Sequence, residues 1–235
     1  MQYFISNIKA FEDIGILNKT ESQHCIRVLR HKPGDKILVT NGDGLLLEAT
    51  ILTADPGKCS FHVVRQLESP KQHPYYLHIA IAPTKNTDRL EWFVEKSVEI
   101  GINEISFVSC RFSERRAVNI ERMLKIAESA MKQSLKTRLP VINGIVPFTD
   151  FISKRSIGLK CIAHCMGDKK VHLTESLNSG HNHITVIIGP EGDFSVEEVE
   201  AAIKQNYYPV SLGENRLRTE TAGLVACVII ASKLN

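Results

Sequence analysis

Two apolar runs that end in glycine turns constrain this chain most. The run 184–188 stops at Gly-Pro-Glu-Gly, residues 189–192, and the run 208–212 stops at Gly213. Each pattern predicts a buried strand that ends and turns. Glycine admits a ligand to the backbone, and open sheets bind ligands beyond the carboxyl ends of their strands. The sequence therefore predicts a ligand site where these strands end, with simple tight turns as the alternative.

The chain after residue 75 alternates between short apolar runs and helical patterns. We expect strands over 77–82, 105–109, 159–163, 185–188 and 208–212. Strands that alternate with helices form parallel sheets, because each helix carries the chain back to the start of the next strand. The pattern predicts an α/β unit whose mainly parallel sheet is covered by helices on both faces.

Capping patterns predict where two of these helices begin. Asp88 is expected to cap a helix that has Glu91 in its first turn and ends at Gly101, because glycine favours the left-handed conformation at a helix end. Ser195 and Glu198 form a capping-box pattern after the Gly-Pro-Glu-Gly turn. A helix should therefore leave the predicted ligand site.

The first 70 residues have a different pattern. Short β-rich runs occupy 36–40, 45–52 and 60–66, and the segment Asn-Gly-Asp-Gly at 41–44 is a hairpin signal. The polar segment 68–74 contains two prolines and fits a linker. We expect a small β domain over residues 1–70 and the α/β domain over residues 75–235.

Composition narrows the class of protein. The chain has 235 residues, of which 43% are hydrophobic and 23% charged, enough for ordinary packed cores. The longest apolar run, 224–231, is too short to cross a bilayer, and the first residues lack a secretory signal pattern. Cys161 and Cys165 are expected to be core thiols on one buried strand. These features predict a cytoplasmic protein with reduced cysteines and no membrane partner.

A formal net charge of only +3 conceals two basic clusters, one near the N-terminus and one beginning at residue 111. The second cluster continues along a predicted helix over 120–135, whose apolar stripe leaves its basic residues facing outward. Clustered positive charge is typical of a surface that docks a polyanion such as RNA, although it can also merely solvate a helix. The candidate RNA-binding residues are His24, Arg27, Arg30, Arg111, Arg115 and Arg116.

Common cofactor motifs are missing from the sequence. There is no GxGxxG after the first predicted strand of the α/β unit, no GxxxxGK[ST] and no GxSxG. His164, His172, His181 and His183 match no common zinc spacing, so no metal is expected. Backbone amides and a few charged side chains remain near the predicted site, which suits a ligand such as adenosine. These charged residues are Glu191, Glu214, Arg216, Arg218 and Glu220.

Several segments match a known family in order and spacing. They are Ile-Gly-Pro-Glu-Gly at 188–192 followed by Phe-Ser, Leu-Gly at 212–213, Leu-Arg-Thr-Glu-Thr-Ala at 217–222, and His-Cys-Ile-Arg-Val-Leu-Arg at 24–30. On these residues the chain resembles the ribosomal RNA small subunit methyltransferase E family of the SPOUT superfamily. Two positions depart from the family pattern: Asp193 stands where a third glycine is usual, and Arg216 where an aliphatic residue is usual.

The resemblance implies a PUA-like β-barrel followed by a trefoil-knotted SPOUT methyltransferase domain. It also implies S-adenosylmethionine as cofactor and methyl transfer to N3 of a uridine in 16S ribosomal RNA of the small ribosomal subunit, at a site of the uridine 1498 type. Glycines in the matching loops admit a ligand, and leucines can flank an adenine ring. The implied cofactor residues are His164, Ile188, Gly189, Gly192, Leu212, Gly213, Leu217, Thr221 and Ala222.

Methylation of uridine N3 sets chemical requirements for the catalytic residues. The weakly acidic imide proton must leave, and the negative charge that develops on O2 or O4 must be held. We expect Arg218 to hold this charge. Glu191 and Glu220 are candidate proton acceptors, but both could instead cap or orient groups at helix N-termini.

A helix predicted from about Thr219 to the end of the chain contains the run 224–231, which is apolar on nearly every side. One sheet face does not require so much apolar surface. SPOUT methyltransferases pair as homodimers, so the resemblance implies a C2 dimer to which this helix contributes. Two other functions stay open: methylation of a ribose hydroxyl in transfer RNA, and a non-catalytic role in RNA binding or ribosome assembly.

Overall fold

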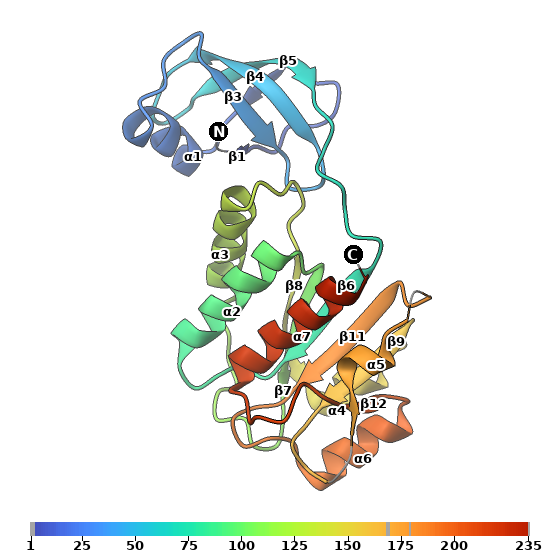
Figure 1. Ribbon diagram of the computed structural model, residues 1–235. Helices are drawn as coiled ribbons and strands as arrows, with labels where there is room; N and C mark the ends of the chain where they lie inside the picture. Colours follow the sequence, from blue (N-terminus) through green and yellow to red (C-terminus); the bar gives the residue numbers. More distant parts are fainter. Residues whose placement is uncertain (1–2, 168–169, 179, 235) are drawn as a thin grey trace. The chain divides into compact units, whose positions relative to one another are not determined.

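The computed structural model describes residues 3–167, 170–178 and 180–234. The chain divides into two compact units (Figure 1). The N-terminal unit comprises Met1–Gln72 and Glu128–Leu139, and the C-terminal unit comprises His73–Ala127 and Pro140–Asn235. The sequence patterns did not predict that a segment from the middle of the chain would join the first unit. No helix within the described ranges is long and apolar enough to cross a membrane.

The N-terminal unit contains a five-stranded sheet of order β1-β3-β4-β5-β2. Its strands are β1 (Tyr3–Ile5), β2 (Ile14–Ile16), β3 (Lys36–Thr40), β4 (Leu46–Thr53) and β5 (Ser60–Gln66). The hydroxyl of Ser6 donates to the carbonyl of Ile16 at 2.9 Å, which brings the two edges of the sheet together. The curled sheet encloses an apolar core that includes Phe4, Val39 and Phe61.

The longer strands of this sheet follow the predicted runs, and the middle one is shifted by one residue. At the predicted hairpin, the side-chain oxygen of Asn41 accepts the amides of Asp43 and Leu45, and Gly42 and Gly44 have positive φ angles of 76° and 98°. Four other short elements of this unit were not predicted, because they show no clear period. They are β1, β2, the helix α1 (Lys19–Gln23) and the π-helix η1 (His24–Val28).

The C-terminal unit contains a seven-stranded sheet of order β10-β12-β9-β11-β6-β7-β8, in which every pairing is parallel. The five predicted strands are confirmed as β6 (Tyr76–Ile81), β7 (Glu104–Ser109), β9 (Leu159–Ala163), β11 (His183–Ile188) and β12 (Tyr208–Ser211). Two further strands, β8 (Val141–Pro147) and β10 (Val171–His172), lie at the edges. Edge strands lack the continuous apolar sequence that marks the buried centre of a parallel sheet.

Helices pack on both faces of this sheet. The helices α2 (Thr87–Ile100) and α7 (Thr219–Leu234) lie together on one face (Figure 1), and a Cβ atom on Gly223 of α7 would lie 2.7 Å from the ring of Phe93. On the other face, α4 (Phe148–Ser153) and α6 (Val196–Lys204) bury Ala80 and Ile187 of the sheet. A short helix, α5 (Leu173–Ser176), packs against α7.

The helix ends follow their capping residues with one correction. The capping box of Ser195 and Glu198 starts α6, and Gly101 ends α2 in the left-handed conformation with φ 113°, both as predicted. Asp88 is not the cap of α2, because the helix begins two residues earlier in the chain than predicted. The side chain of Asn86 caps it by accepting the amide of Asp88 at 2.9 Å.

The helix α3 (Ile120–Gln133) has residues in both units. Met123 and Ala127 of its predicted apolar stripe are buried, whereas Leu124 is 38% exposed. The helix ends before Leu135, which has a positive φ of 55°. The prediction that the helix reaches residue 135 was therefore too long, since an αL residue cannot continue an α-helix.

Candidate functional site

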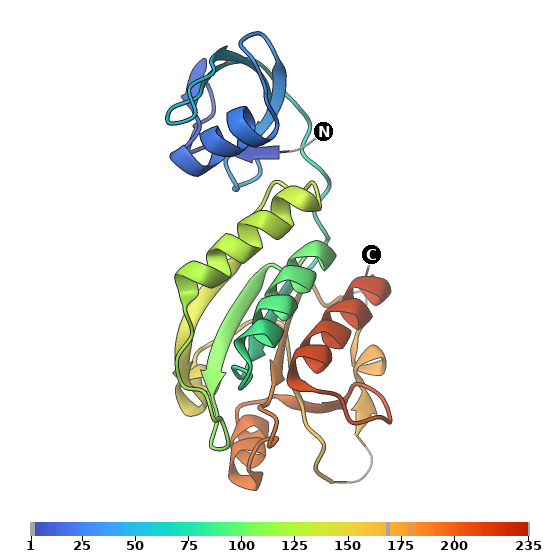
Figure 2. The same cartoon turned by 90° about the vertical axis from the view of Figure 1, so that its left-hand side faces the viewer.

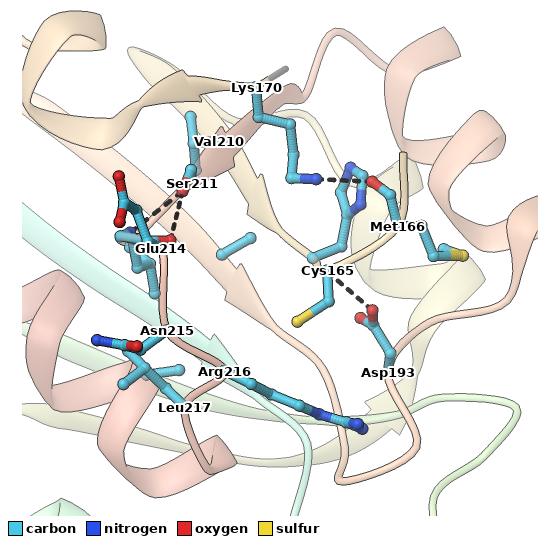
Figure 3. Close-up of a pocket in the computed structure, with 15 residues that line it drawn as sticks. Cys165, Met166, Lys170, Asp193, Val210, Ser211, Glu214, Asn215, Arg216 and Leu217 are labelled. Atoms are coloured by element: carbon cyan, nitrogen blue, oxygen red, sulfur yellow. Dashed lines mark hydrogen bonds between the residues drawn. The ribbon is translucent and has the colours of Figure 1, made fainter. Parts of the chain in front are cut away.

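The carboxyl ends of β9, β11 and β12 lie beside the loop that leads into α7. Two adjoining cavities, of about 410 and 260 Å³, open there; we call them the edge cavities (Figure 3 shows the larger). Both occur where the two glycine turns predicted a ligand site. The residues common to both cavities are Ala163, Cys165, Asp193, Arg216, Leu217 and Ala222.

The edge cavities bring together seven of the nine residues that the family resemblance implies for the cofactor. They are His164, Ile188, Gly189, Leu212, Gly213, Leu217 and Ala222. Gly192 and Thr221 line neither cavity. A Cβ atom on Gly192 would lie 3.0 Å from the Cβ of Phe112, so this glycine allows two loops to pack closely.

The turn after β12 keeps space open inside the larger cavity. Gly213 has a φ of 136°, and a Cβ atom added there would meet no atom within 4 Å. The hydroxyl of Ser211 bonds both the amide and the carbonyl of Gly213, at 3.1 and 3.0 Å. A glycine conformation and a side-chain clamp therefore fix this turn, and empty space adjoins it.

His164 lines the larger cavity with ring nitrogens whose hydrogen-bonding capacity is not used within the part of the chain that the structure describes. Both of its ring nitrogens are buried without a well-formed hydrogen bond among the described residues, although its ring lies near the backbone of Met166. Burial, followed by the charge of Lys170, lowers the pKa of His164, and Asp193 partly offsets this shift. A neutral imidazole can both donate and accept, so it suits a polar ligand.

Asp193, one of the two departures from the family pattern, joins two loops of the site. It has a positive φ of 64°, which is uncommon for any residue other than glycine. Its Oδ2 accepts the amide of Cys165 at 2.8 Å, and its Oδ1 accepts the amide of Phe194 at 2.9 Å. The carboxylate thus ties the loop after β9 to the turn after β11.

The prediction that Cys165 is a core thiol is wrong. Cys161 is buried on β9, and burial raises its pKa to about 12. Cys165, in contrast, is exposed and lines both edge cavities (Figure 3). The physical reason is that β9 ends at Ala163, so Cys165 lies in the loop beyond the sheet.

Three of the charged residues lie at the smaller cavity. Arg218 is exposed and directly precedes α7, and Glu191 lines the same cavity while its Oε1 accepts the amide of Lys85 at 3.0 Å. Arg216 extends toward Asp193 (Figure 3) and donates to the carbonyl of Glu191 at 3.4 Å. A cation and a carboxylate therefore share one cavity wall.

Glu220, the other candidate proton acceptor, is placed differently. It lies in the first turn of α7, is 6% exposed and lines neither edge cavity. Its Oε1 is 3.7 Å from Nε of Arg89, and its Oε2 has no hydrogen-bond partner in the described structure. This position suits a group that orients the start of α7. Glu214 lines the larger cavity.

The candidate RNA-binding residues of the N-terminal unit lie on or just after η1. His24 and Arg27 belong to this π-helix, and Arg30 follows it with a positive φ of 59°. Arg27 and Arg30 are exposed. Their guanidinium groups are therefore presented to solvent by a short, irregular helical turn.

The other three candidates lie in the loop after β7. Arg111 pairs with Glu197 at 3.2 Å, and Arg115 donates to the carbonyl of Lys85 at 2.9 Å. Arg116 is exposed. Two of these three arginines thus already bind groups of their own unit, which the sequence did not indicate.

Sequence reasoning missed several residues of the edge cavities, including Met166, Lys170 and Ser211. All of them lie at or after the carboxyl end of a strand that was predicted. Applying the same rule to β9 as to β11 and β12 would have pointed to the loop from residue 164 onward, because all three strands are parallel neighbours. No apolar run ending in glycine marks that loop.

Comparisons with known proteins agree with this architecture. Residues 71–231 match the family model of the RNA methyltransferase domain, and residues 17–64 match the model of the RNA methyltransferase PUA domain. The chain is 33% identical to the ribosomal RNA small subunit methyltransferase E of Rickettsia conorii over 85% of this chain and 81% of that protein.

Solved structures resemble the whole chain. A probable rRNA-methyltransferase from Porphyromonas gingivalis is 40% identical with a TM-score of 0.91, covering 100% of this chain and 98% of that one. A methyltransferase from Legionella pneumophila, solved with bound S-adenosylmethionine, is 26% identical with a TM-score of 0.85, covering 98% and 96%. From its match to the RNA methyltransferase model over most of its length and its identity to the Rickettsia enzyme, the chain belongs to the ribosomal RNA small subunit methyltransferase E family.

Proposed function

We propose that this protein transfers a methyl group from S-adenosylmethionine to N3 of a uridine in 16S ribosomal RNA, at a site of the uridine 1498 type. The observation that carries the proposal is the pair of edge cavities, with Arg218 and Glu191 on the wall of the smaller one. The names of the family members support a ribosomal RNA substrate, and the Legionella structure supports the cofactor.

The edge cavities fit a nucleoside cofactor. Unfilled nitrogens on His164 and open space beside Gly213 are features that a polar, partly flat ligand can use. We assign the seven cavity-lining residues of the cofactor set to direct contact, and Gly192 and Thr221 to support of the loops. When bound, S-adenosylmethionine supplies a methyl group activated by its positively charged sulfur.

The protein's own residues provide for the proton and the charge. Loss of the N3 proton leaves negative charge on O2 and O4 of uracil, and we assign the guanidinium of Arg218, which lines the smaller cavity, to hold that charge. We assign Glu191 as the proton acceptor, because its carboxylate lines the same cavity. Glu191 would accept the proton of N3, and the electron pair left on N3 would take the methyl group that S-adenosylmethionine would supply, while the bond from that carbon to sulfur breaks and its electron pair stays on sulfur. Glu220 is assigned to orienting α7.

RNA binding is proposed for the exposed cations of both units. Arg27, Arg30 and Arg116 should contribute most, because they are exposed. His24 is assigned a smaller share, as are Arg111 and Arg115, which must exchange present partners for phosphate. Since its substrate is ribosomal RNA, the proposal assigns the protein to the cytoplasm.

We also propose a homodimer that includes α7, and a trefoil knot in the C-terminal unit. Val228 on α7 is 45% exposed, and Ile229 beside it is half-buried, which leaves apolar surface for a partner. The segment 212–218 lines the edge cavities together with the loops after β9 and β11. The chain then continues into α7, which packs against β6. If this path is knotted, pulling on both ends of the unit should give a shorter extended length than about 3.5 Å per residue.

The decisive test is the nucleoside content of ribosomal RNA. Digests of 16S RNA from a strain that lacks the gene should have lost one 3-methyluridine, which the wild-type gene restores and an Arg218→Ala gene does not. Loss of a ribose-methylated nucleoside from transfer RNA would instead support the transfer RNA alternative. Unchanged methylation in all RNA would support a non-catalytic role.

A further inference from the structure

Another cavity, of about 580 Å³, lies in the C-terminal unit and shares no residue with the edge cavities. Its floor is one face of the sheet, where four neighbouring strands each contribute polar side chains. These are His183 and Thr185 of β11, His78 of β6, Glu104 and Ser106 of β7, and Asn143 of β8. We call it the sheet-face cavity. The helices α4 and α6 bury the adjacent apolar half of the same face.

The floor of the sheet-face cavity is a built hydrogen-bond network. His78 Nε2 lies 2.9 Å from the hydroxyl of Ser106, and the amide nitrogen of Asn143 donates to Ser106 at 2.9 Å and to Glu104 at 2.6 Å. The hydroxyl of Tyr76 donates to the other oxygen of Glu104 at 3.0 Å. Buried polar groups cost free energy unless they are paired, and this network pairs polar groups of β6, β7 and the edge strand β8 with one another.

Two polar groups on the floor of the cavity lack a hydrogen-bond partner in the described part of the chain. Thr185 is 1% exposed, and its hydroxyl has no hydrogen-bond partner among the described residues; the same holds for Nδ1 of His183. Unpaired polar atoms at such depth are rare in native proteins. Both residues line the cavity, so a ligand with polar hydrogens and acceptors can supply the missing hydrogen-bond partners. The carboxylate of Glu104, 22% exposed, offers acceptors in the same cavity, two strands away on β7.

The rim of the cavity has the opposite character. Lys154 and Arg155 follow α4, are exposed, and form no ion pair within residues 3–167, 170–178 and 180–234. Phe151 and Tyr207 also line the cavity, but both are buried, at 7% and 2% exposed, and Lys160 lies over the ring of Tyr207. The cavity therefore combines two free cations outside with neutral hydrogen-bonding groups and one carboxylate inside.

We propose that the sheet-face cavity binds a ribonucleotide, either free or as one nucleotide of an RNA chain. Its phosphate meets Lys154 and Arg155, its base occupies the cavity, and its polar hydrogens reach Thr185 and Glu104. A ribonucleotide carries an anion, a flat ring and several polar hydrogens, and a cavity of this volume is of ligand size. The proposal does not depend on methyl transfer at the edge cavities.

Calorimetric titration of the full-length protein tests this site. The probes are the four ribonucleoside 5′-monophosphates, the matching nucleosides, ribose 5-phosphate and a short single-stranded RNA. Thr185→Val keeps the shape of the side chain and removes one hydroxyl, so it should weaken nucleotide binding about fivefold to tenfold. The double variant Lys154→Ala/Arg155→Ala should weaken it about tenfold. Lys204→Ala, at an exposed lysine of α6, is the matched control and should change nothing.

The outcomes separate the source of the ligand. Binding of a free mononucleotide that Thr185→Val weakens identifies a free nucleotide, whereas an effect of Thr185→Val on RNA alone identifies a nucleotide of the chain. The proposal is overturned if Thr185→Val and the rim variant bind both the mononucleotides and the RNA as tightly as wild type does. It is also overturned if ribose 5-phosphate binds as tightly as the nucleotides. S-adenosylmethionine affinity, measured in parallel, should stay at the wild-type value in every variant. If the wild-type protein does not bind S-adenosylmethionine at all, that result counts against the proposed methyltransferase function and not against the nucleotide site.

Discussion

The edge cavities and the sheet-face cavity lie in the same unit but are built in different ways. Loops after strands form the edge cavities, and consecutive residues such as 211–217 provide both backbone groups and side chains. Alternate side chains of four strands form the floor of the sheet-face cavity. Contiguous residues form a motif that can be recognised in a sequence. Residues that come together only through strand pairing do not.

Their electrostatics differ as well. At the edge cavities, Arg218 and Glu191 are exposed charged groups beside the start of α7, where a developing charge can be held and a proton moved. At the sheet-face cavity, burial lowers the pKa of His78 to about 4, against the opposing effect of Glu104. His78 is therefore neutral at pH 7, even though it lies 3.7 Å from that carboxylate. We therefore expect chemistry in the first region and recognition in the second.

If chemistry belongs to the edge cavities, Arg218→Ala should have the largest effect. Removing a fixed positive charge from a developing oxyanion costs about a hundredfold to a thousandfold in kcat. The affinity for S-adenosylmethionine should stay within about threefold, since the charge acts on uracil. Methyl transfer to 16S RNA under saturating cofactor measures the first quantity and calorimetry the second. A kcat within about threefold of wild type would remove Arg218 from the mechanism.

The role of backbone shape at the edge cavities can be tested at Gly213. Gly213→Val forces a branched residue into a positive φ, a strain of about 1–3 kcal/mol, and should weaken S-adenosylmethionine binding about tenfold to hundredfold. Gly34→Val is the matched control, because Gly34 has a φ of 92°, also has no atom within 4 Å of an added Cβ, and lies in the N-terminal unit. Equal affinities of the two variants would mean that the turn at Gly213 does not shape the site.

The sheet-face cavity predicts a pH dependence of stability that the edge cavities do not require. The folded pKa of His78, about 4, lies below the ordinary value of 6.5 for histidine, so between these values the unfolded chain binds more protons than the folded one. Stability contributed by His78 is therefore present above pH 6.5 and is lost as pH falls. From pH 7 to pH 5 the loss is about 2 kcal/mol.

His78→Gln removes the titrating group, so it should reduce this pH dependence by about that amount. Urea unfolding of both proteins at pH 7 and pH 5 gives the difference directly. The groups that face His78 are Glu104 on β7 and His183 on β11, and both remain in the variant. Parallel pH profiles of the two proteins would show that His78 is not held neutral by the sheet.

The smallest effect is expected at α7, which lies on the opposite face of the sheet from the sheet-face cavity. Val228→Glu should weaken the proposed dimer about tenfold, because a charge is costly in an apolar contact. Val64→Glu replaces a similarly exposed valine of the N-terminal unit and should leave the dimer intact. Sedimentation velocity distinguishes the two variants. A wild-type protein that is monomeric and fully active would reject the dimer.

The central strands and the glycine turns could be predicted from the sequence because their signals are local. Runs of five residues, 184–188 and 208–212, marked β11 and β12, and the capping box at Ser195 marked α6. The edge strand β8 was missed because its side chains alternate irregularly between partly buried and exposed positions, and Gly144 interrupts it. Its place in the sheet is determined by pairing with β7, which no local pattern encodes.

The candidate site, like the fold, could be predicted only where its sequence signals are local. Residues 188–189 and 212–213 were found through their glycines, but the loop from His164 was known only through a family resemblance. The position of Cys165 was predicted wrongly, because an apolar run that predicts a strand does not show at which residue the strand ends. The sheet-face cavity was not predicted at all, since His78, Glu104 and Thr185 lie in three separate strands and become neighbours only after folding.

The segment 128–139 bears on how this protein can be divided and recombined. Its Lys132 pairs with Glu21, Arg138 pairs with Asp43 at 2.7 Å, and the carbonyl of Thr137 accepts the hydroxyl of Thr40 at 3.3 Å. A truncation at residue 72 would therefore deprive the β-sheet unit of part of its own surface, and leave the remaining chain with a half helix that has lost its partners. A chimera that exchanges this unit between family members must carry residues 128–139 along with residues 1–72, as a graft made from two pieces of chain.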